Sequence, residues 1–245
     1  MGGRLYSAAM SWIVWVQRAV VTAAVCAGAA ACTDFAPPST LERPTVIAIT
    51  AEPPTVGVGQ STRLELIVAS ADGQLAVNAA QWSITPTIPG VPALGSVTTN
   101  LDGSATYVAP AVLPMLPAEA QPVDTVAVDL MLGEVLTRSV KVVVVANLPQ
   151  PPQNPTITSL LVDNVPAPAA ITLKAGIRAD LRAEIAPIAS DTAAYAWYAS
   201  IGKIDQYLSN PTSILADEPG TGWLFFVVRD GQLGLAWRKM PIIVQ

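Results

Sequence analysis

The chain has 245 residues, 51% of them apolar and only 13% charged, which excludes a disordered chain and predicts a packed core of one large domain or two of about 100 residues. It contains no histidine, which excludes Ser-His and Cys-His catalytic pairs and imidazole metal sites. The net charge is −5 and the longest basic run is Arg238-Lys239, so nucleic-acid binding is not expected.

The first 31 residues have the pattern of an export signal. Arg4 and Arg18 supply its positive region, and residues 19–31 form an uncharged run rich in alanine and valine. A run of this length is too short to span a bilayer, which needs about 20 apolar residues. We therefore expect residues 1–31 to be a cleaved signal peptide, with either Met1 or Met10 as its start.

A cysteine stands at the end of this run. The stretch "AAAC", residues 29–32, resembles the signal of bacterial lipoproteins, although that family prefers leucine at the position of Ala29. The resemblance implies that the chain is cut before Cys32 and that this cysteine carries a covalent lipid; no other cofactor is expected. The alternative is an ordinary signal with Cys32 as an unmodified thiol. Two or three acyl chains hold a protein stably, since each buried CH₂ contributes about 0.8 kcal/mol.

The residues after the cysteine suit a tether. Residues 32–44 are polar and rich in proline, as in flexible or semi-rigid spacers. Thr33, and not aspartate, follows the cysteine, and the resemblance to lipoprotein sorting then implies the outer membrane. Cys26 would leave with the signal, so no disulfide is expected in the mature chain.

A second Pro-rich stretch divides the rest of the chain. Residues 147–155, "NLPQPPQNP", are too dense in proline for a helix or a central strand. They separate residues 45–146 from residues 156–245, and each piece has the length of one small β-sandwich. The organisation predicted is therefore a tether, a first domain, a linker and a second domain.

Both pieces contain alternating apolar and polar residues. Residues 62–69, "TRLELIVA", read as a half-buried strand. Residues 176–186, "GIRADLRAEIA", alternate in the same way, with Ile177 first on the apolar side, but also fit one face of a helix. Gly59 precedes Leu64 by five residues, as Gly176 precedes Leu181, and this match favours strands and an internal repeat.

The repeat extends to a tryptophan in each half, Trp82 and Trp197, which we expect in the two cores. The first half resembles the bacterial Ig-like repeats of surface and exported proteins, and the second half resembles them more weakly. The resemblance implies an all-β fold of two tandem Ig-like Greek-key β-sandwiches. The positions that carry it in the first half are Pro54, Gly59, Trp82, Gly95, Tyr107 and Pro110.

No constellation of residues indicates catalysis or metal binding. Asp124 and Asp129 lie five apart on one expected strand, so they point to opposite faces, and we interpret both as solvated charges. Trp223, Phe226 and Trp237 lie in the last two strands and are the candidate partner contacts. Residues 141–146, "KVVVVA", are apolar on both sides, which fits either burial by the other domain or an edge offered to a partner.

The sequence therefore predicts a non-catalytic, lipid-anchored protein of the outer membrane, on its periplasmic or extracellular face. Its expected partners are the membrane, through the lipid, and other proteins of the cell envelope, for which it would be a structural, adhesive or accessory subunit. The alternative is a carbohydrate-binding lipoprotein that uses exposed aromatic side chains.

Overall fold

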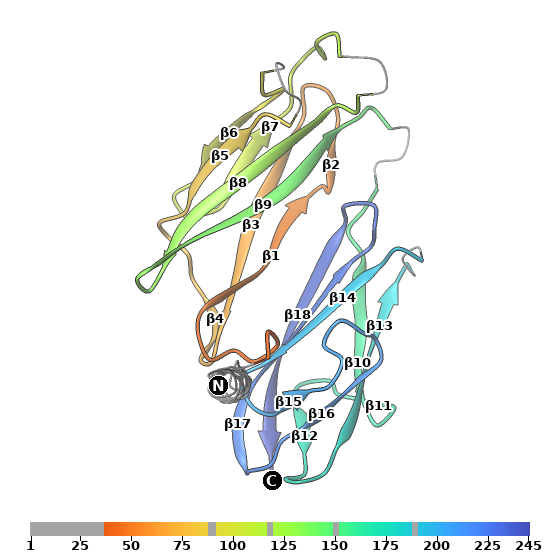
Figure 1. Cartoon of the computed structure of the whole chain (residues 1–245). Helices are drawn as coiled ribbons and strands as arrows, with labels where there is room; N and C mark the ends of the chain where they lie inside the picture. Colours follow the sequence, from red (N-terminus) through yellow and green to blue (C-terminus); the bar gives the residue numbers. More distant parts are fainter. Residues whose placement is uncertain (1–36, 88–91, 117–119, 149–151, 188–190) are drawn as a thin grey trace, which may run out of the picture. The chain divides into compact units, whose positions relative to one another are not determined.

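The computed structural model describes residues 37–87, 92–116, 120–148, 152–187 and 191–245. The chain from Pro38 to Gln245 forms one compact unit, and its regular secondary structure in these ranges is entirely β (Figure 1). No helix among the described residues is long and apolar enough to cross a membrane. The predicted signal peptide and Cys32 lie outside the described residues.

The first sandwich consists of two sheets. One has the strand order β1-β3-β7-β6, with β4 paired to β3, and the other has the order β2-β9-β8-β5. All pairs are antiparallel except the short contact of β2 with β9. The strands are β1 (Thr45–Glu52), β2 (Thr55–Val56), β3 (Ser61–Ser70), β4 (Gly73–Leu75), β5 (Gln81–Thr85), β6 (Ser96–Thr99), β7 (Ala105–Val108), β8 (Val123–Leu132) and β9 (Val135–Val145).

The second sandwich repeats this plan. Its sheets have the orders β11-β10-β13-β16-β15 and β12-β18-β17-β14. The strands are β10 (Thr156–Val162), β11 (Val165–Pro166), β12 (Ile171–Leu173), β13 (Ala179–Ala186), β14 (Ala194–Ala199), β15 (Lys203–Ile204), β16 (Thr212–Leu215), β17 (Gly220–Arg229) and β18 (Leu235–Val244).

The strand order identifies both sandwiches as Ig-like. In an Ig domain, one sheet has the order A-B-E-D and the other the order C-F-G. The sheets β1-β3-β7-β6 and β2-β9-β8-β5 follow this order, with β2 as a short extra strand on β9, and the second sandwich follows it too (Figure 1). The predicted fold class is confirmed.

Each sandwich has its own apolar core. Leu64 on β3 and Leu181 on β13 are buried at equivalent positions, as the repeat predicts. The stretch that fitted either a helix or a strand is strand β13. Ile177 was expected on its buried side, but it lies in the turn before β13 and is 56% exposed, because the strand begins only at Ala179.

A third apolar cluster joins the two sandwiches. From the first sandwich it takes residues of β1 and β3, such as Ile47 and Ile67, and from the second it takes residues of β14, β17 and β18, such as Phe225. These side chains point away from the two sandwich cores. The buried members are Leu41, Ile47, Ala48, Ile67, Ala69, Ala196, Phe225, Val227 and Leu235.

Two segments outside the sandwiches add polar contacts to this junction. Asn154, in the predicted linker, donates to Ala51 O (2.7 Å) and accepts from Leu235 N (2.8 Å), so one side chain binds both sandwiches. Residues 38–41, in the predicted tether, lie against β14 of the second sandwich, where Thr40 forms a parallel bridge with Ala199. The junction is therefore built from four parts of the chain.

Candidate interaction surface

The outer edge of β9 is paired along only a short part of its length. Val145 N donates to Pro122 O, so the odd-numbered residues of β9 direct their N–H and C=O groups toward β8. The even-numbered residues then direct theirs to the other side, as Ala146 N does toward Val56 O of β2. β2 pairs only with Val144 and Val145. Within the described chain, no strand pairs with this edge at Leu136, Arg138, Val140 or Val142.

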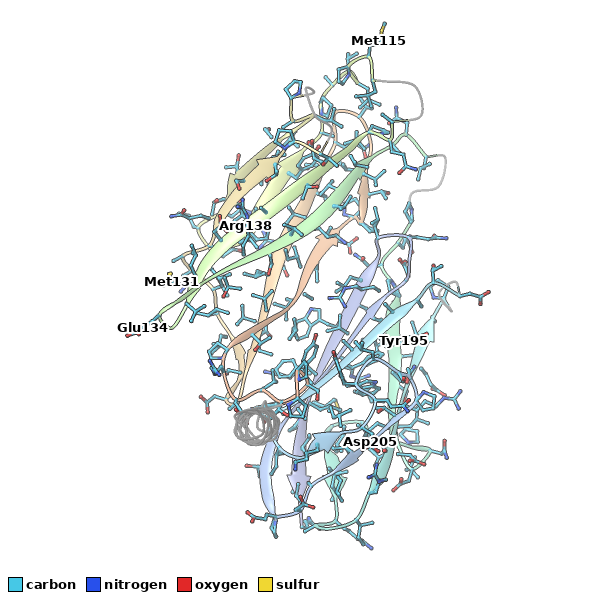
Figure 2. The ribbon with its side chains drawn as sticks, viewed as in Figure 1. Met115, Met131, Glu134, Arg138, Tyr195 and Asp205 are labelled. Carbon is cyan, nitrogen blue, oxygen red and sulfur yellow. The ribbon has the colours of Figure 1, made fainter. Side chains whose placement is uncertain are left out.

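The same residues place apolar side chains in solvent. Leu136 is 68% exposed, Val140 60% and Val142 38%, and they share the outer face of the sheet with Met131 of β8. Figure 2 shows Met131, Glu134 and Arg138 along the β8–β9 hairpin. Arg138 forms an ion pair with Asp129 on β8 (3.5 Å), which leaves the apolar side chains as the main exposed feature of this edge. An unpaired apolar edge is suited to pairing with another strand.

Strand β18 occupies the equivalent place in the second sandwich, and its edge is protected. Asp230 N donates to Gly234 O, so the outward N–H groups of β18 belong to the odd-numbered residues. Leu235 N is capped by Asn154, Pro241 has no N–H, and Lys239 places a charge between them. The chain thus caps or removes two outward N–H groups of β18, at Leu235 and Pro241, whereas no described strand pairs with the outer edge of β9 from Leu136 to Val142.

A shallow groove follows part of the β9 edge. It is lined by Ile49, Val140 and Val142 of the first sandwich and, from the second, by Arg229, Gly231, Leu233, Gly234 and Leu235. At its base, Lys141 Nζ donates to Leu233 O (2.7 Å). Burial and the nearby Arg229 guanidinium lower the pKa of Lys141 to about 8. The stretch "KVVVVA" therefore meets the second sandwich at Lys141, buries Val143 and Val145 in the core of the first sandwich and exposes Val142.

The three aromatic residues predicted as partner contacts do not line the outer edge of β9. Phe226 is fully buried in the core of the second sandwich, where its ring packs on Trp197 with centroids 4.3 Å apart. It is not a contact residue, because residues at successive positions of β17 point to opposite faces and Phe226 takes the inner one. Trp223 and Trp237 take the outer face, but they pack against the cluster at the junction.

The two core tryptophans make the same bond in each sandwich. Trp82 Nε1 donates to Gly103 O (3.0 Å), and Trp197 Nε1 donates to Ser209 O (2.8 Å). Both indoles are buried, so neither is available as a platform for a sugar ring. In both cases the indole ties its strand to the connection between two strands of the other sheet, β6–β7 in the first sandwich and β15–β16 in the second.

Asp124 is buried, contrary to its interpretation as a solvated charge. Its carboxylate accepts from Leu94 N (2.9 Å), Gly95 N (2.8 Å) and Tyr107 Oη (2.8 Å). Burial, with this bond, raises the pKa of Tyr107. A side chain on Gly95 would collide with the Tyr107 ring, so glycine is required there. The role of Asp124 is structural, since it holds the segment before β6 against the core.

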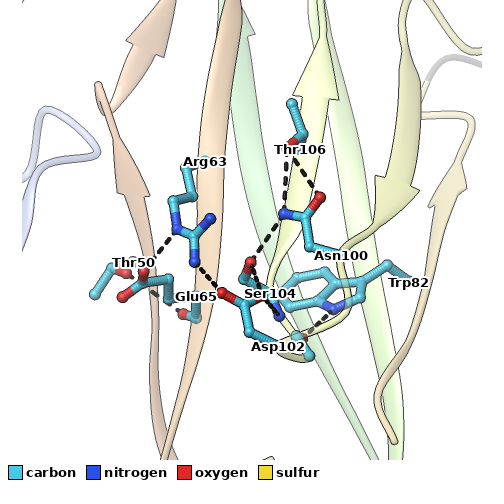
Figure 3. A network of polar contacts seen from close by, with 9 residues as sticks. Thr50, Arg63, Glu65, Trp82, Asn100, Asp102, Ser104 and Thr106 are labelled. Atoms are coloured by element: carbon cyan, nitrogen blue, oxygen red, sulfur yellow. Dashed lines mark hydrogen bonds and ion pairs between the residues drawn. The ribbon is translucent and has the colours of Figure 1, made fainter. Parts of the chain in front are cut away.

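A second network of polar side chains in the first sandwich surrounds Arg63 and joins β3 to the β6–β7 turn. Arg63 pairs with Glu65 (2.8 Å) and with Asp102 of the β6–β7 turn (Figure 3). Hydrogen bonds from Ser104, followed by the contact with Arg63, lower the pKa of Asp102 to about 2. All three charged groups are exposed. No group of three potential metal-ligating side chains occurs in the described ranges of the chain.

No protein-family model matches the sequence, and no curated protein matches it. Solved structures similar to the chain include the Yersinia pseudotuberculosis adhesin InvE, with 12% identity over 82% of this chain and 60% of the adhesin, at a TM-score of 0.27. The D00-D0 domain of intimin has 11% identity over 82% of this chain and 98% of its own length, at a TM-score of 0.29. Domains 4–9 of the surface layer protein SbsC have 13% identity over 82% of this chain and 32% of their own length, at a TM-score of 0.28. Likeness at this level carries no argument about function, which has to come from the chain's own geometry.

Proposed function

We propose that this chain is a lipid-anchored, non-catalytic protein of the outer membrane that serves as a structural, adhesive or accessory subunit and binds a partner protein by strand addition along β9. The observation that carries the proposal is the contrast between two equivalent edges. β18 is closed by Asn154, Lys239 and Pro241, whereas β9 offers unpaired backbone groups flanked by exposed valine and leucine side chains.

The chemistry of the edge defines the partner segment. The outward groups of Leu136, Arg138, Val140 and Val142 supply alternating donors and acceptors over about 20 Å, since an antiparallel strand rises about 3.4 Å per residue. A matching segment is extended, lacks proline at its own inward positions, and carries apolar side chains on the face next to Val140. Main-chain bonds then supply affinity and the side chains supply specificity.

The anchor rests on the sequence pattern "AAAC" at Cys32. Its test is the intact mass of the protein extracted from membranes, in the natural chain and in Cys32→Ala. We expect a mature chain that starts at Cys32 and carries two or three acyl chains, and we expect the variant to carry none. An unlipidated chain cut near Ala31 in the natural protein would refute the anchor. It would not bear on strand addition along β9.

The carbohydrate-binding alternative has less support. It needs exposed aromatic side chains, and none is among the exposed large apolar residues of the described chain. Trp82 and Trp197 are in the cores, and Trp223 and Trp237 are packed at the junction. Quenching of tryptophan fluorescence by glycans tests this alternative directly, and we expect none.

A further inference from the structure

The short segment Ser39–Leu41, here called the strap, is bound to the second sandwich although it precedes the first. Leu41 N donates to Ala199 O (2.9 Å), and Ala199 N donates to Ser39 O (2.8 Å). The strap thereby adds a parallel strand to the outer edge of β14, whose other edge pairs with β17. The chain then continues into β1 of the first sandwich.

The strap is also part of the apolar cluster between the sandwiches. Leu41 is 1% exposed and packs with residues of both, including Ile47 and Phe225. Ser39 is equally buried, and its hydroxyl group has no hydrogen-bond partner. Because docking removes the apolar Leu41 side chain from water, the cluster stabilises the bound position of the strap.

We propose that the strap fixes the junction of the two sandwiches next to the lipid bilayer, so that the membrane-proximal surface is formed by the strap and the β14 end of the second sandwich. The inference rests on the proposed lipid at Cys32. Ser39 lies seven positions after Cys32, and seven Cα-to-Cα steps span at most about 25 Å. Because the strap is bound at the junction of the two sandwiches, the junction also lies within about this distance of the lipidated cysteine.

On this proposal we expect the far end of the first sandwich to lie farther from the membrane than the strap. Thr45, at the start of β1, pairs with Ala69, and Glu52, at its end, pairs with Arg63. The strap therefore leads into β1 at one end of the sheet, and β1 runs from there toward the opposite end. The β7–β8 loop begins after Val108, which pairs with Ser61 at the opposite end. The eight residues of β1 separate the two ends by about 25 Å.

Single-site labelling can measure this orientation. In the mature chain the lipid would occupy the one remaining cysteine, so an introduced cysteine is the only free thiol. A donor dye is attached at Lys203→Cys, four residues after Ala199, or at Met115→Cys, which is 99% exposed in the β7–β8 loop. The lipidated protein is placed in phosphatidylethanolamine–phosphatidylglycerol vesicles that carry an energy acceptor on their headgroups.

We expect energy transfer from the Lys203→Cys label to be several times stronger than transfer from the Met115→Cys label. Leu41→Asp should release the strap and reduce this ratio toward one, while Ser39→Ala, which removes only an unpartnered hydroxyl, should preserve it. Equal transfer from the two sites in the lipidated parent, or stronger transfer from Met115→Cys, would overturn the proposal.

A second measurement covers the case in which Leu41→Asp fails to fold. Amide hydrogen exchange of the lipidated parent measures directly whether the strap is bound to β14, and we expect slow exchange at Leu41 N and Ala199 N. Fast exchange at both would show that the strap is not docked. If intact mass shows no lipid on Cys32, the proposed anchor fails, whereas slow exchange would still establish the strap.

Discussion

At the scale of single residues, the buried carboxylate of Asp124 holds three hydrogen-bond donors in place. Asp124→Ala leaves Leu94 N, Gly95 N and the Tyr107 hydroxyl without their acceptor. We expect a loss of about 3 kcal/mol in the free energy of unfolding, since each unsatisfied buried donor costs about 1–3 kcal/mol. Asp129→Ala is the matched control, and its surface ion pair should be worth less than about 1 kcal/mol. Equal losses in urea titrations would contradict this role.

Lys141 should make stability depend on pH. Its pKa is about 8 in the folded chain, below the ordinary lysine value of 10.5, so between pH 8 and pH 10 the unfolded chain binds a proton that the folded chain does not. The free energy of unfolding therefore rises with pH in this window. We expect a rise of about 1–2 kcal/mol in the parent and a flat profile in Lys141→Met. Urea midpoints at pH 8, 9 and 10 measure it, and a fall with pH in the parent would refute the assignment.

At the scale of strands, two neighbouring proline substitutions separate the two sides of β9. Val140→Pro removes an N–H that points to the open edge, so the β8–β9 ladder keeps its bonds. Ser139→Pro removes an N–H that points to β8, and we expect it to cost about 3 kcal/mol. Thermal unfolding of both variants tests the orientation of the edge. A larger loss for Val140→Pro would contradict it.

The strands themselves could be predicted from sequence, and their outer contacts could not. Alternation at residues 62–69 and 176–186 predicted β3 and β13, and their equivalent spacing predicted the repeat. Alternation also predicts that Trp223 and Phe226 point to opposite faces of β17. Alternation alone does not show which face of β17 packs in the sandwich core, because both faces are apolar. One is buried in that core and the other in the cluster between the sandwiches.

The burial of Asp124 and the docking of the strap could not be predicted from the sequence for a related reason. The partners of Asp124 lie 17 to 30 residues away in the sequence, and those of the strap lie about 160 residues away, so no local pattern records them. The sequence left two alternatives for "KVVVVA", burial by the other domain or an edge offered to a partner. Lys141 contacts the second sandwich and β2 covers the edge at Val144 and Val145, whereas most of the uncovered positions, Leu136, Arg138 and Val140, precede this stretch.

At the scale of the whole unit, the junction cluster should couple the unfolding of the two sandwiches. Ile67→Asp places a charge among Ile47, Phe225 and their neighbours, and burial of an unpaired charge is strongly unfavourable. We expect one calorimetric transition in the parent and two in this variant. Val165→Asp, at an exposed position of β11, is the control and should leave one transition. Two transitions in the parent would show that the sandwiches unfold independently.

The central claim is that β9 receives a strand from a partner protein, and site-specific photo-crosslinking in intact cells tests it most directly. A photoreactive residue replaces Val140 or, as the control, Lys239 at the equivalent position of β18. We predict one discrete crosslinked product from position 140, its loss when Val142→Pro is added to block the edge, and no product from position 239. A product from position 140 that survives Val142→Pro, or no product at all, would contradict strand addition at β9.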